Sequence, residues 1–167
     1  AKLIEADLSQ VNLETLDLSF ATLKGANLRG TRLDRAHLYD ADLTGADLTG
    51  ASLFYADLDR ACFIYANLSG ASIATRHLCA TDFRGADLRG ALLGGTRPWE
   101  SHWKHVWKGV LADENTRWPK GFNPATFGIR MWKSPGLYNP FRPSVGVREK
   151  QTLRAATEYM TRRSSEG

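Results

Sequence analysis

A repeat with a period of five residues runs through the first 97 positions and limits the folds that this chain can adopt. Of the 19 positions taken every fifth residue from Leu3 to Leu93, 16 are Leu, two are Phe and one is Ile. Two residues before each of them, 14 of the 19 positions are Ala. A period of five matches neither an α-helix, which repeats every 3.6 residues, nor a flat strand, which repeats every two.

Glycine often follows the repeated leucine by two positions and marks a turn. The positions are Gly25, Gly30, Gly45, Gly50, Gly70, Gly85 and Gly90. Gly tolerates the positive φ that a type II turn requires at its third residue. We therefore expect each repeat to form a very short strand followed by a turn. The chain should coil, and successive coils should pair through backbone hydrogen bonds.

The pattern Ala-(Asp/Asn)-Leu-x-x resembles that of the pentapeptide-repeat family, as in the two identical copies of ADLTG at residues 41–45 and 46–50. The resemblance covers residues 1–97 and implies an all-β fold, a right-handed four-sided β-helix (solenoid) with four repeats per coil. It also implies that the Leu and the Ala of each repeat point inward and the other three side chains outward. Leu and Ala would then stack on their own kind and fill a dry core.

Outward side chains 20 residues apart should form columns with a spacing of about 4.8 Å. One column reads Asp7, Asn27, Asp47, Asn67, Asp87, an alternation that separates like charges. Another reads Asp17, His37, Asp57, His77 and is expected to be an exposed charge stripe that contributes little to stability. A partly pH-sensitive ladder, in which the acids favour charged histidines, is the alternative hypothesis. Arg76 occupies an inward position, and the cost of burying its charge predicts an irregularity from Thr75 to His77.

The two cysteines, Cys62 and Cys79, both map to outward positions. The coil register places their Cα atoms about 10 Å apart, beyond the limit of about 7 Å for a disulfide. We expect free thiols, which fit a reducing compartment and a cytoplasmic location. A thylakoid-associated or lumenal location is the alternative if the N-terminus is processed.

The composition changes after residue 97 and predicts two domains. All five Trp and all six Pro lie at or after Pro98. Residues 1–97 carry 12 acidic and 10 basic side chains, whereas residues 98–167 carry 6 acidic and 12 basic ones. We assign residues 1–97 to the β-helix and residues 98–167 to a Trp-rich capping segment with a basic, Pro-rich tail.

Trp99, Trp103 and Trp107 recur at helical spacing and predict a C-terminal helix that caps the open end of the β-helix. The alternative is an exposed Trp-rich partner site. Residues 115–124, NTRWPKGFNP, resemble a terminal stretch of cyanobacterial pentapeptide-repeat proteins and predict a rigid turn at Pro119 and Gly121. The Pro- and Gly-rich residues 134–145 should form an extended tail.

The sequence holds no Gly-rich phosphate loop, no nucleophile elbow and no clustered metal ligands. The pair His102 and His105 alone is a poor metal motif. We therefore expect no enzyme activity, no catalytic residue, no cofactor and no metal. The favoured function is a protein-interaction scaffold that docks on or links a larger protein assembly.

Partner-binding candidates are exposed aromatic residues and the aromatic and basic residues of the tail. They are Phe54, Tyr55, Ile64, Tyr65, Trp99, Trp103, Trp107, Tyr138, Phe141 and Arg142. Phe20 and Tyr39 are also outward-facing and share a side in adjacent coils. For the outward aromatics, a footprint of the tail is the favoured interpretation, and an external partner or no role at all are the alternatives.

The resemblance offers a second function, a DNA-mimicking modulator of DNA gyrase or topoisomerase IV. A rod of nearly five coils is about 23 Å long, and DNA of that length carries roughly 14 negative charges. Residues 1–97 carry an excess of only two acidic side chains. This low charge disfavours DNA mimicry, and nucleic acid is not an expected partner. No apolar run approaches the roughly 20 residues of a membrane-spanning helix.

Overall fold

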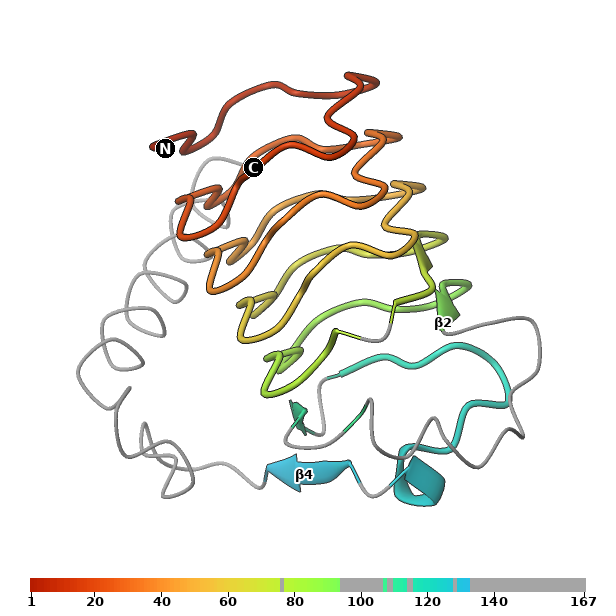
Figure 1. Cartoon of the computed structure of the whole chain (residues 1–167). Coiled ribbons are helices and arrows are strands. Elements are labelled where there is room, and N and C mark those ends of the chain that lie inside the picture. The colour runs from red at the N-terminus through yellow and green to blue at the C-terminus, as the bar shows by residue number, and fades with distance from the viewer. Residues whose placement is uncertain (76, 94–106, 108–109, 114–115, 128, 133–167) are drawn as a thin grey trace, which may run out of the picture. The chain divides into compact units, whose positions relative to one another are not determined.

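The computed structural model describes residues 1–75, 77–93, 107, 110–113, 116–127 and 129–132 of the chain (Figure 1). Strand β1 (Ser72–Ile73) pairs in parallel with β2 (Leu92–Leu93), and β3 (Leu111–Asp113) pairs in parallel with β4 (Arg130–Trp132). A short 3-10 helix, η1, spans Pro124–Phe127. Isolated parallel bridges join residues 20 apart, from Lys2–Thr22 to Asn67–Asp87. The predicted β-helix with 20 residues per coil is therefore confirmed.

A tight turn ends nearly every repeat and gives the coil its four corners. The first of these turns closes with a hydrogen bond from the Ala6 N–H to the Leu3 carbonyl, at 3.3 Å. The second turn residue has a positive φ, as a type II turn requires, even where it is not Gly, as at Arg35 (58°) and Tyr55 (57°). A left-handed conformation costs a non-Gly residue about 1–2 kcal/mol. The register of the coil therefore overrides local preference at these corners.

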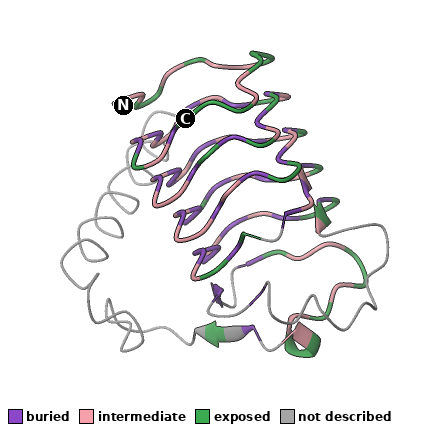
Figure 2. Ribbon diagram, in the orientation of Figure 1, coloured by how far each residue is buried: buried purple, intermediate pink, exposed green. Residues whose placement is uncertain are grey.

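Each repeat donates and accepts backbone hydrogen bonds along the coil axis. For example, the N–H groups of Leu23 and Gly25 donate to the carbonyls of Asp42 and Thr44, at 2.7 and 2.9 Å. The Asp42 N–H donates in the other direction, to the Ala21 carbonyl at 2.9 Å. The described inward side chains are buried from Leu18 to Ala91 (Figure 2). In this core the rings of Phe63 and Phe83 stack with their centroids 5.3 Å apart. The coil thus encloses a packed core.

The expected irregularity near Arg76 is present in the residues around it. Thr75 lacks the positive φ of the other turns and is buried, with its Oγ1 donating to the Ala56 carbonyl. The His77 N–H donates to the same Oγ1, at 3.2 Å. A threonine therefore turns inward one position before the arginine. Arg76 itself lies outside the described residues.

The C-terminal end of the coil is covered by further backbone pairing. Asp82 bridges to Leu111 and Asp87 bridges to Arg117, so the ladder continues past the last regular repeat. The N–H groups of Phe83 and Leu88 donate to the carbonyls of Leu111 and Arg117, at 2.9 and 2.7 Å. Strand β4 then pairs with β3 as one more layer (Figure 1). Unpaired edges of the last coil are thus satisfied by strands.

The predicted capping helix over residues 99–110 falls mostly outside the described part of the chain. Trp99 and Trp103 are not described, and Trp107 lies in a turn that closes with a bond from the Val110 N–H to the Trp107 carbonyl. No α-helix occurs among the described residues. The covering element that the structure does show is the strand continuation, and it supplies backbone partners that a helix lying across the end cannot supply.

Four aromatic rings form a second small core beneath this strand continuation. Trp107 is buried, and its ring centroid lies 5.4 to 6.3 Å from those of Trp118, Phe122 and Phe127. The predicted turn is confirmed because Gly121 has a φ of 84° and the Phe122 N–H donates to the Pro119 carbonyl at 3.1 Å. This turn brings Phe122 back over Trp118, where the two rings stack.

The first compact unit extends from Ala1 to Trp132, and a second comprises Lys133–Gly167. The described residues of the Trp-rich segment therefore belong to the same unit as the β-helix. The second unit, which holds the predicted extended tail, lies outside the described residues. Within the described part of the chain, no helix is long and apolar enough to cross a membrane.

Two Asp–Arg pairs with the same local geometry occupy different environments. In each pair the arginine Nε lies 2.9 Å and the Nη2 lies 2.6 Å from the carboxylate two residues earlier. The side chains of Arg84 and Asp82 are 4% and 2% exposed. Those of Arg89 and Asp87 are 62% and 21% exposed. Comparing the two pairs therefore tests how burial changes the contribution of an ion pair to stability.

We predict that Arg84→Ala lowers the free energy of unfolding by about 3 kcal/mol or more, because it leaves the Asp82 carboxylate buried without its guanidinium. Arg89→Ala should change stability little, because water already solvates that exposed pair. Chemical denaturation of both variants, monitored by circular dichroism, measures the difference. Equal destabilisation by the two substitutions would contradict the assigned burial.

Candidate protein-binding surface

The side of the coil that contains His37 and Asp57 combines aromatic, acidic and imidazole groups. Bridges Asp17–His37, His37–Asp57 and Asp57–His77 confirm the predicted column. We number the sides of the coil in chain order, so that residues 1–5, 6–10, 11–15 and 16–20 begin the first to fourth sides. The fourth-side surface is the column on the fourth side together with outward residues beside it and at the adjoining corners. It comprises Asp17, Phe20, His37, Tyr39, Tyr55, Asp57, Asp59, Arg60, His77 and Cys79.

An aromatic and cationic cluster lies at one corner of the fourth-side surface. Phe20 is 59% exposed and meets Tyr39 edge to face, with ring centroids 5.6 Å apart. The Arg60 guanidinium carbon lies 5.7 Å from the Tyr39 ring centroid, within range of a cation–π interaction. Arg60 Nε is also 3.8 Å from Asp40 Oδ1. Aromatic and arginine side chains are enriched in protein interfaces and in their energetic hot spots.

Beside this cluster, two carboxylates of one repeat face an imidazole of the next coil. The Asp59 N–H donates to Asp57 Oδ1 at 3.1 Å, and the Cys79 N–H donates to Asp59 Oδ1 at 2.7 Å. His77 Nδ1 lies 3.8 Å from Asp59 Oδ2. The ligand atoms of Asp57, Asp59 and His77 all lie within 4.8 Å of one another. Backbone hydrogen bonds thus hold one oxygen of each carboxylate in place.

One member of the ladder shows the electrostatic effect of its neighbours. Hydrogen bonds from the Ser19 N–H and hydroxyl, together with the His37 imidazole, hold the pKa of Asp17 below its ordinary value. The Ser19 hydrogen bonds are the larger cause, and the His37 imidazole contributes less. The pH sensitivity of the whole ladder stays a prediction.

The second side of the coil differs from the fourth, because its acidic side chains contact polar and basic side chains of the same side. The predicted column from Asp7 to Asp87 is confirmed by bridges. Asn27 Nδ2 donates to Asp7 Oδ1 at 3.0 Å, and Arg29 lies 3.2 Å from Asp47. Hydrogen bonds from the Ser9 hydroxyl and N–H lower the pKa of Asp7. Against the opposing effect of burial, the pKa of Asp47 is also lowered, by hydrogen bonds from the Thr49 hydroxyl and N–H and then by Arg29. The second side is a polar ladder that satisfies itself and presents no aromatic cluster.

The structure separates the partner-binding residues predicted from the sequence into three groups. Phe54, Tyr55 and Tyr65 are exposed, and the Tyr65 ring lies so close over Gly85 that a Cβ there would come within 2.4 Å of it. Ile64, although outward from the coil, is only 1% exposed, and Trp107 is buried in the aromatic core of the cap. The remaining candidates lie outside the described residues and are Trp99, Trp103, Tyr138, Phe141 and Arg142.

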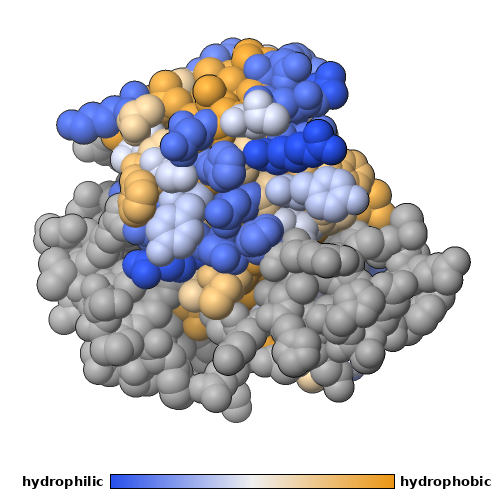
Figure 3. Space-filling view, in the orientation of Figure 1, coloured by the Kyte–Doolittle hydropathy of each residue, from blue (hydrophilic) through white to orange (hydrophobic). Residues whose placement is uncertain are grey.

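Sequence reasoning did not include Arg60 among the candidates. The 20-residue register could have identified Arg60, because it places Arg60 above Asp40 and next to Tyr39 of the preceding coil. Figure 3 shows polar and apolar residues intermixed along the coils, with apolar atoms gathered at the N-terminal end, where Ile4, Val11 and Leu16 are exposed.

Comparison with known proteins agrees with this repeat architecture. A family model described as pentapeptide repeats matches eight copies, over residues 1–35, 17–53 and 36–73. None of the curated proteins compared with the chain matches it. Among solved structures, a pentapeptide repeat protein from the Arabidopsis thaliana thylakoid lumen is 30% identical, with 65% of this chain and 78% of that chain covered and a TM-score of 0.30.

Two further solved structures are similar over part of their length. HetL, a pentapeptide repeat protein involved in heterocyst differentiation regulation from the cyanobacterium Nostoc, is 28% identical, with 73% of this chain and 61% of HetL covered and a TM-score of 0.34. QnrB1, a plasmid-mediated fluoroquinolone resistance protein, is 21% identical, with 65% and 61% covered and a TM-score of 0.37. The chain thus spans less than two thirds of HetL and of QnrB1.

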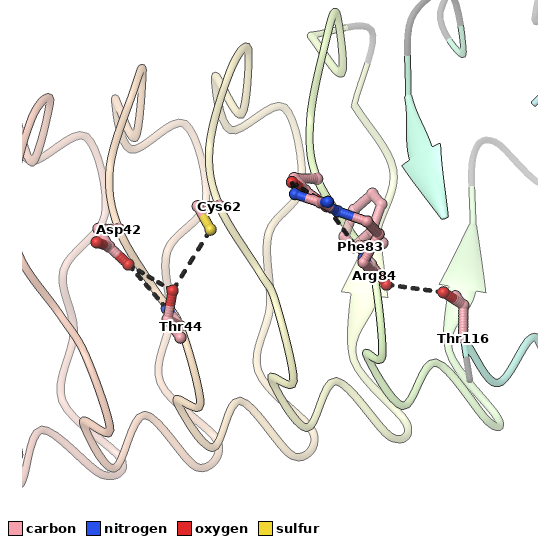
Figure 4. A network of polar contacts seen from close by, with 7 residues as sticks. Asp42, Thr44, Cys62, Phe83, Arg84 and Thr116 are labelled. Atoms are coloured by element: carbon pink, nitrogen blue, oxygen red, sulfur yellow. Dashed lines mark hydrogen bonds and ion pairs between the residues drawn. The ribbon is translucent and has the colours of Figure 1, made fainter. Parts of the chain in front are cut away.

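The two cysteines report on opposite environments and are both free, as predicted. Cys79 is exposed on the fourth-side surface. Cys62 is only partly exposed and its sulfur lies 3.4 Å from the Thr44 hydroxyl (Figure 4). Burial and the Asp82 and Asp42 carboxylates raise the pKa of the Cys62 thiol to about 12.

We predict that one thiol per folded chain reacts quickly with Ellman's reagent at pH 8, because the thiolate is the reactive form. Cys79 should react at least about 100-fold faster than Cys62, whose raised pKa leaves very little thiolate at that pH. Stopped-flow absorbance measures both phases. Cys79→Ser should remove the fast phase and Cys62→Ser should keep it, whereas two equally fast phases would contradict the assignment.

Proposed function

We propose, given that the chain belongs to the pentapeptide-repeat family, that it is a non-catalytic interaction scaffold that docks on or links a larger protein assembly. The observation that carries this proposal is the exposed cluster of Phe20, Tyr39 and Arg60 on the fourth-side surface. Such a cluster supplies the residue types that dominate the binding energy of protein interfaces.

Rigidity of the coil supports a docking role. Backbone hydrogen bonds to the next coil hold the cluster residues in place. The Phe20 N–H donates to the Tyr39 carbonyl at 2.9 Å, and the Arg60 N–H donates to the Cys79 carbonyl at 2.8 Å. Few backbone degrees of freedom are therefore lost when a partner binds. A preorganised surface binds more tightly than a flexible one of equal area.

A packed interior supports a function without catalysis. Leu, Ala and Phe side chains fill the inward positions of the coils and leave the outer faces for recognition. Catalytic sites usually need a concave pocket with convergent polar groups. The acidic side chains of the coil are instead distributed along its outside by the repeat.

The tail contributes to the same proposal as an attachment arm. Trp99, Trp103, Tyr138, Phe141 and Arg142 provide aromatic and basic groups in the sequence outside the described residues. We also propose a cytoplasmic location, because an exposed free thiol such as Cys79 persists best in a reducing compartment.

Affinity capture from the organism that produces the protein tests the proposal. The baits are the full chain, a Phe20→Ser/Arg60→Ser variant, and a control with Arg29→Ser/Arg89→Ser on the second side. We expect quantitative mass spectrometry to find a discrete partner that the full chain and the control retain. The fourth-side variant should lose it by at least about tenfold, as expected when hot-spot residues are removed.

A chain that ends at Trp132, where the first compact unit ends, lacks Tyr138, Phe141 and Arg142 but keeps Trp99 and Trp103, so it tests the part of the arm beyond residue 132. Reduced capture by this chain, with an unchanged circular dichroism spectrum, would support the attachment arm. A partner retained equally by the fourth-side variant would contradict the proposal. Capture of gyrase or topoisomerase IV by every bait would favour the DNA-mimicking alternative instead.

A further inference from the structure

We propose that Asp57, Asp59 and His77 form a binding site for a divalent transition-metal ion such as Zn²⁺. Their ligand atoms lie within 4.8 Å of one another on the fourth-side surface. Two carboxylates come from one repeat, and the imidazole comes from the stacked position of the next coil. The inference does not depend on the proposed scaffold function, because it rests on a separate group of side chains.

The repeat that supplies the carboxylates departs from all the others. At residues 56–60 the sequence reads ADLDR, and this is the one repeat of residues 1–97 with acidic side chains at both outward positions that flank the Leu. One coil later, the same two positions are His77 and Cys79. An electronegative pair therefore lies directly beneath a side chain that commonly ligates metals.

Among the described residues, this pair lacks the arginine partners that Asp47 and Asp87 have. Asp47 and Asp87 each lie within 3.2 Å of an arginine nitrogen, from Arg29 and Arg89. Within the described part of the chain, Asp57 and Asp59 make no ion pair with Lys or Arg, and His77 is the one basic group close to them. Two adjacent carboxylates without such a partner repel each other, so a bound cation relieves the repulsion.

The hydrogen bonds leave one oxygen of each carboxylate for a ligand. Asp57 Oδ1 and Asp59 Oδ1 accept backbone N–H groups, at 3.1 and 2.7 Å. Asp59 Oδ2 faces His77 Nδ1 at 3.8 Å, too far for a hydrogen bond. Zinc bonds to carboxylate oxygen and imidazole nitrogen are about 2.0–2.2 Å long, so an ion fits between atoms at this separation.

Completing the ligand set requires the side chains to move closer together. In a tetrahedral zinc site, ligand atoms with bonds of about 2.0–2.2 Å lie about 3.3–3.6 Å apart, whereas the three ligand atoms here lie within 4.8 Å of one another. The His77 side chain is 58% exposed and can make this adjustment. Three protein ligands leave a fourth coordination position for water or for a group of another molecule.

The ligand chemistry selects the class of metal. Mixed imidazole and carboxylate ligation suits Zn²⁺ and its first-row neighbours, whereas Ca²⁺ and Mg²⁺ require sites built from oxygen ligands. An exposed three-ligand site of this kind should bind Zn²⁺ more weakly than a buried structural zinc centre, whose ligands are all supplied by the protein.

Isothermal titration of the full chain with Zn²⁺ alone tests the site. We expect saturable binding that weakens by at least about tenfold in His77→Asn and in Asp59→Asn. Both side chains are partly or fully exposed, so the fold should persist, and circular dichroism checks that it does. The matched control is His37→Asn, because His37 stacks on Asp57 from the preceding coil and lies outside the ligand group. Its affinity for Zn²⁺ should equal that of the unchanged chain.

Three outcomes would overturn the proposal. The first is an absence of saturable binding to the full chain. The second is an equal loss of affinity in His37→Asn and His77→Asn, which would indicate a diffuse electrostatic effect. The third is binding that survives His77→Asn and disappears in a His102→Asn/His105→Asn variant, which would place the ion on the C-terminal segment.

Discussion

Parallel backbone hydrogen bonding at a separation of 20 residues is the constraint on which the rest of this structure depends. It fixes every coil over the one before it, so inward Leu and Ala must stack on their own kind. It also holds residues such as Arg35 and Tyr55 at a positive φ that they do not prefer. Side chains on the outside are placed by the same register, and the proposed docking surface is part of that fixed array.

The sequence predicted those parts of the structure that follow from the period. Four sides, turn positions, the two charge columns and the free cysteines are consequences of a 20-residue coil. The C-terminal cover was not predictable in the same way, because Leu111 and Arg117 pair with Asp82 and Asp87 at separations of 29 and 30 residues. A helical spacing of tryptophans carried no information about this strand pairing.

The candidate site was predictable only in part, for a related reason. The 20-residue register specifies which residues share a column, so the column from Asp17 to His77 could be predicted from the sequence. Contacts between columns depend on side-chain rotamers, and the approach of Arg60 to Tyr39 is one such contact. Burial is likewise set by the surroundings, since the Asp82–Arg84 and Asp87–Arg89 pairs share their local geometry and differ in exposure.

Residues that depart from the repeat pattern are informative about function, because the regular repeat alone is enough to make the coil stable. A regular copy such as residues 46–50 needs only a small and a large inward residue, a turn and a solvated surface. Asp59, Arg60 and His77 add nothing to the apolar core, and the adjacent carboxylates of Asp57 and Asp59 repel each other. The Asp59 carboxylate also accepts the Cys79 N–H of the next coil, so it has a structural role beside any role in recognition. The concentration of these residues on the fourth side, next to the exposed Phe20 and Tyr39, supports the proposed docking role.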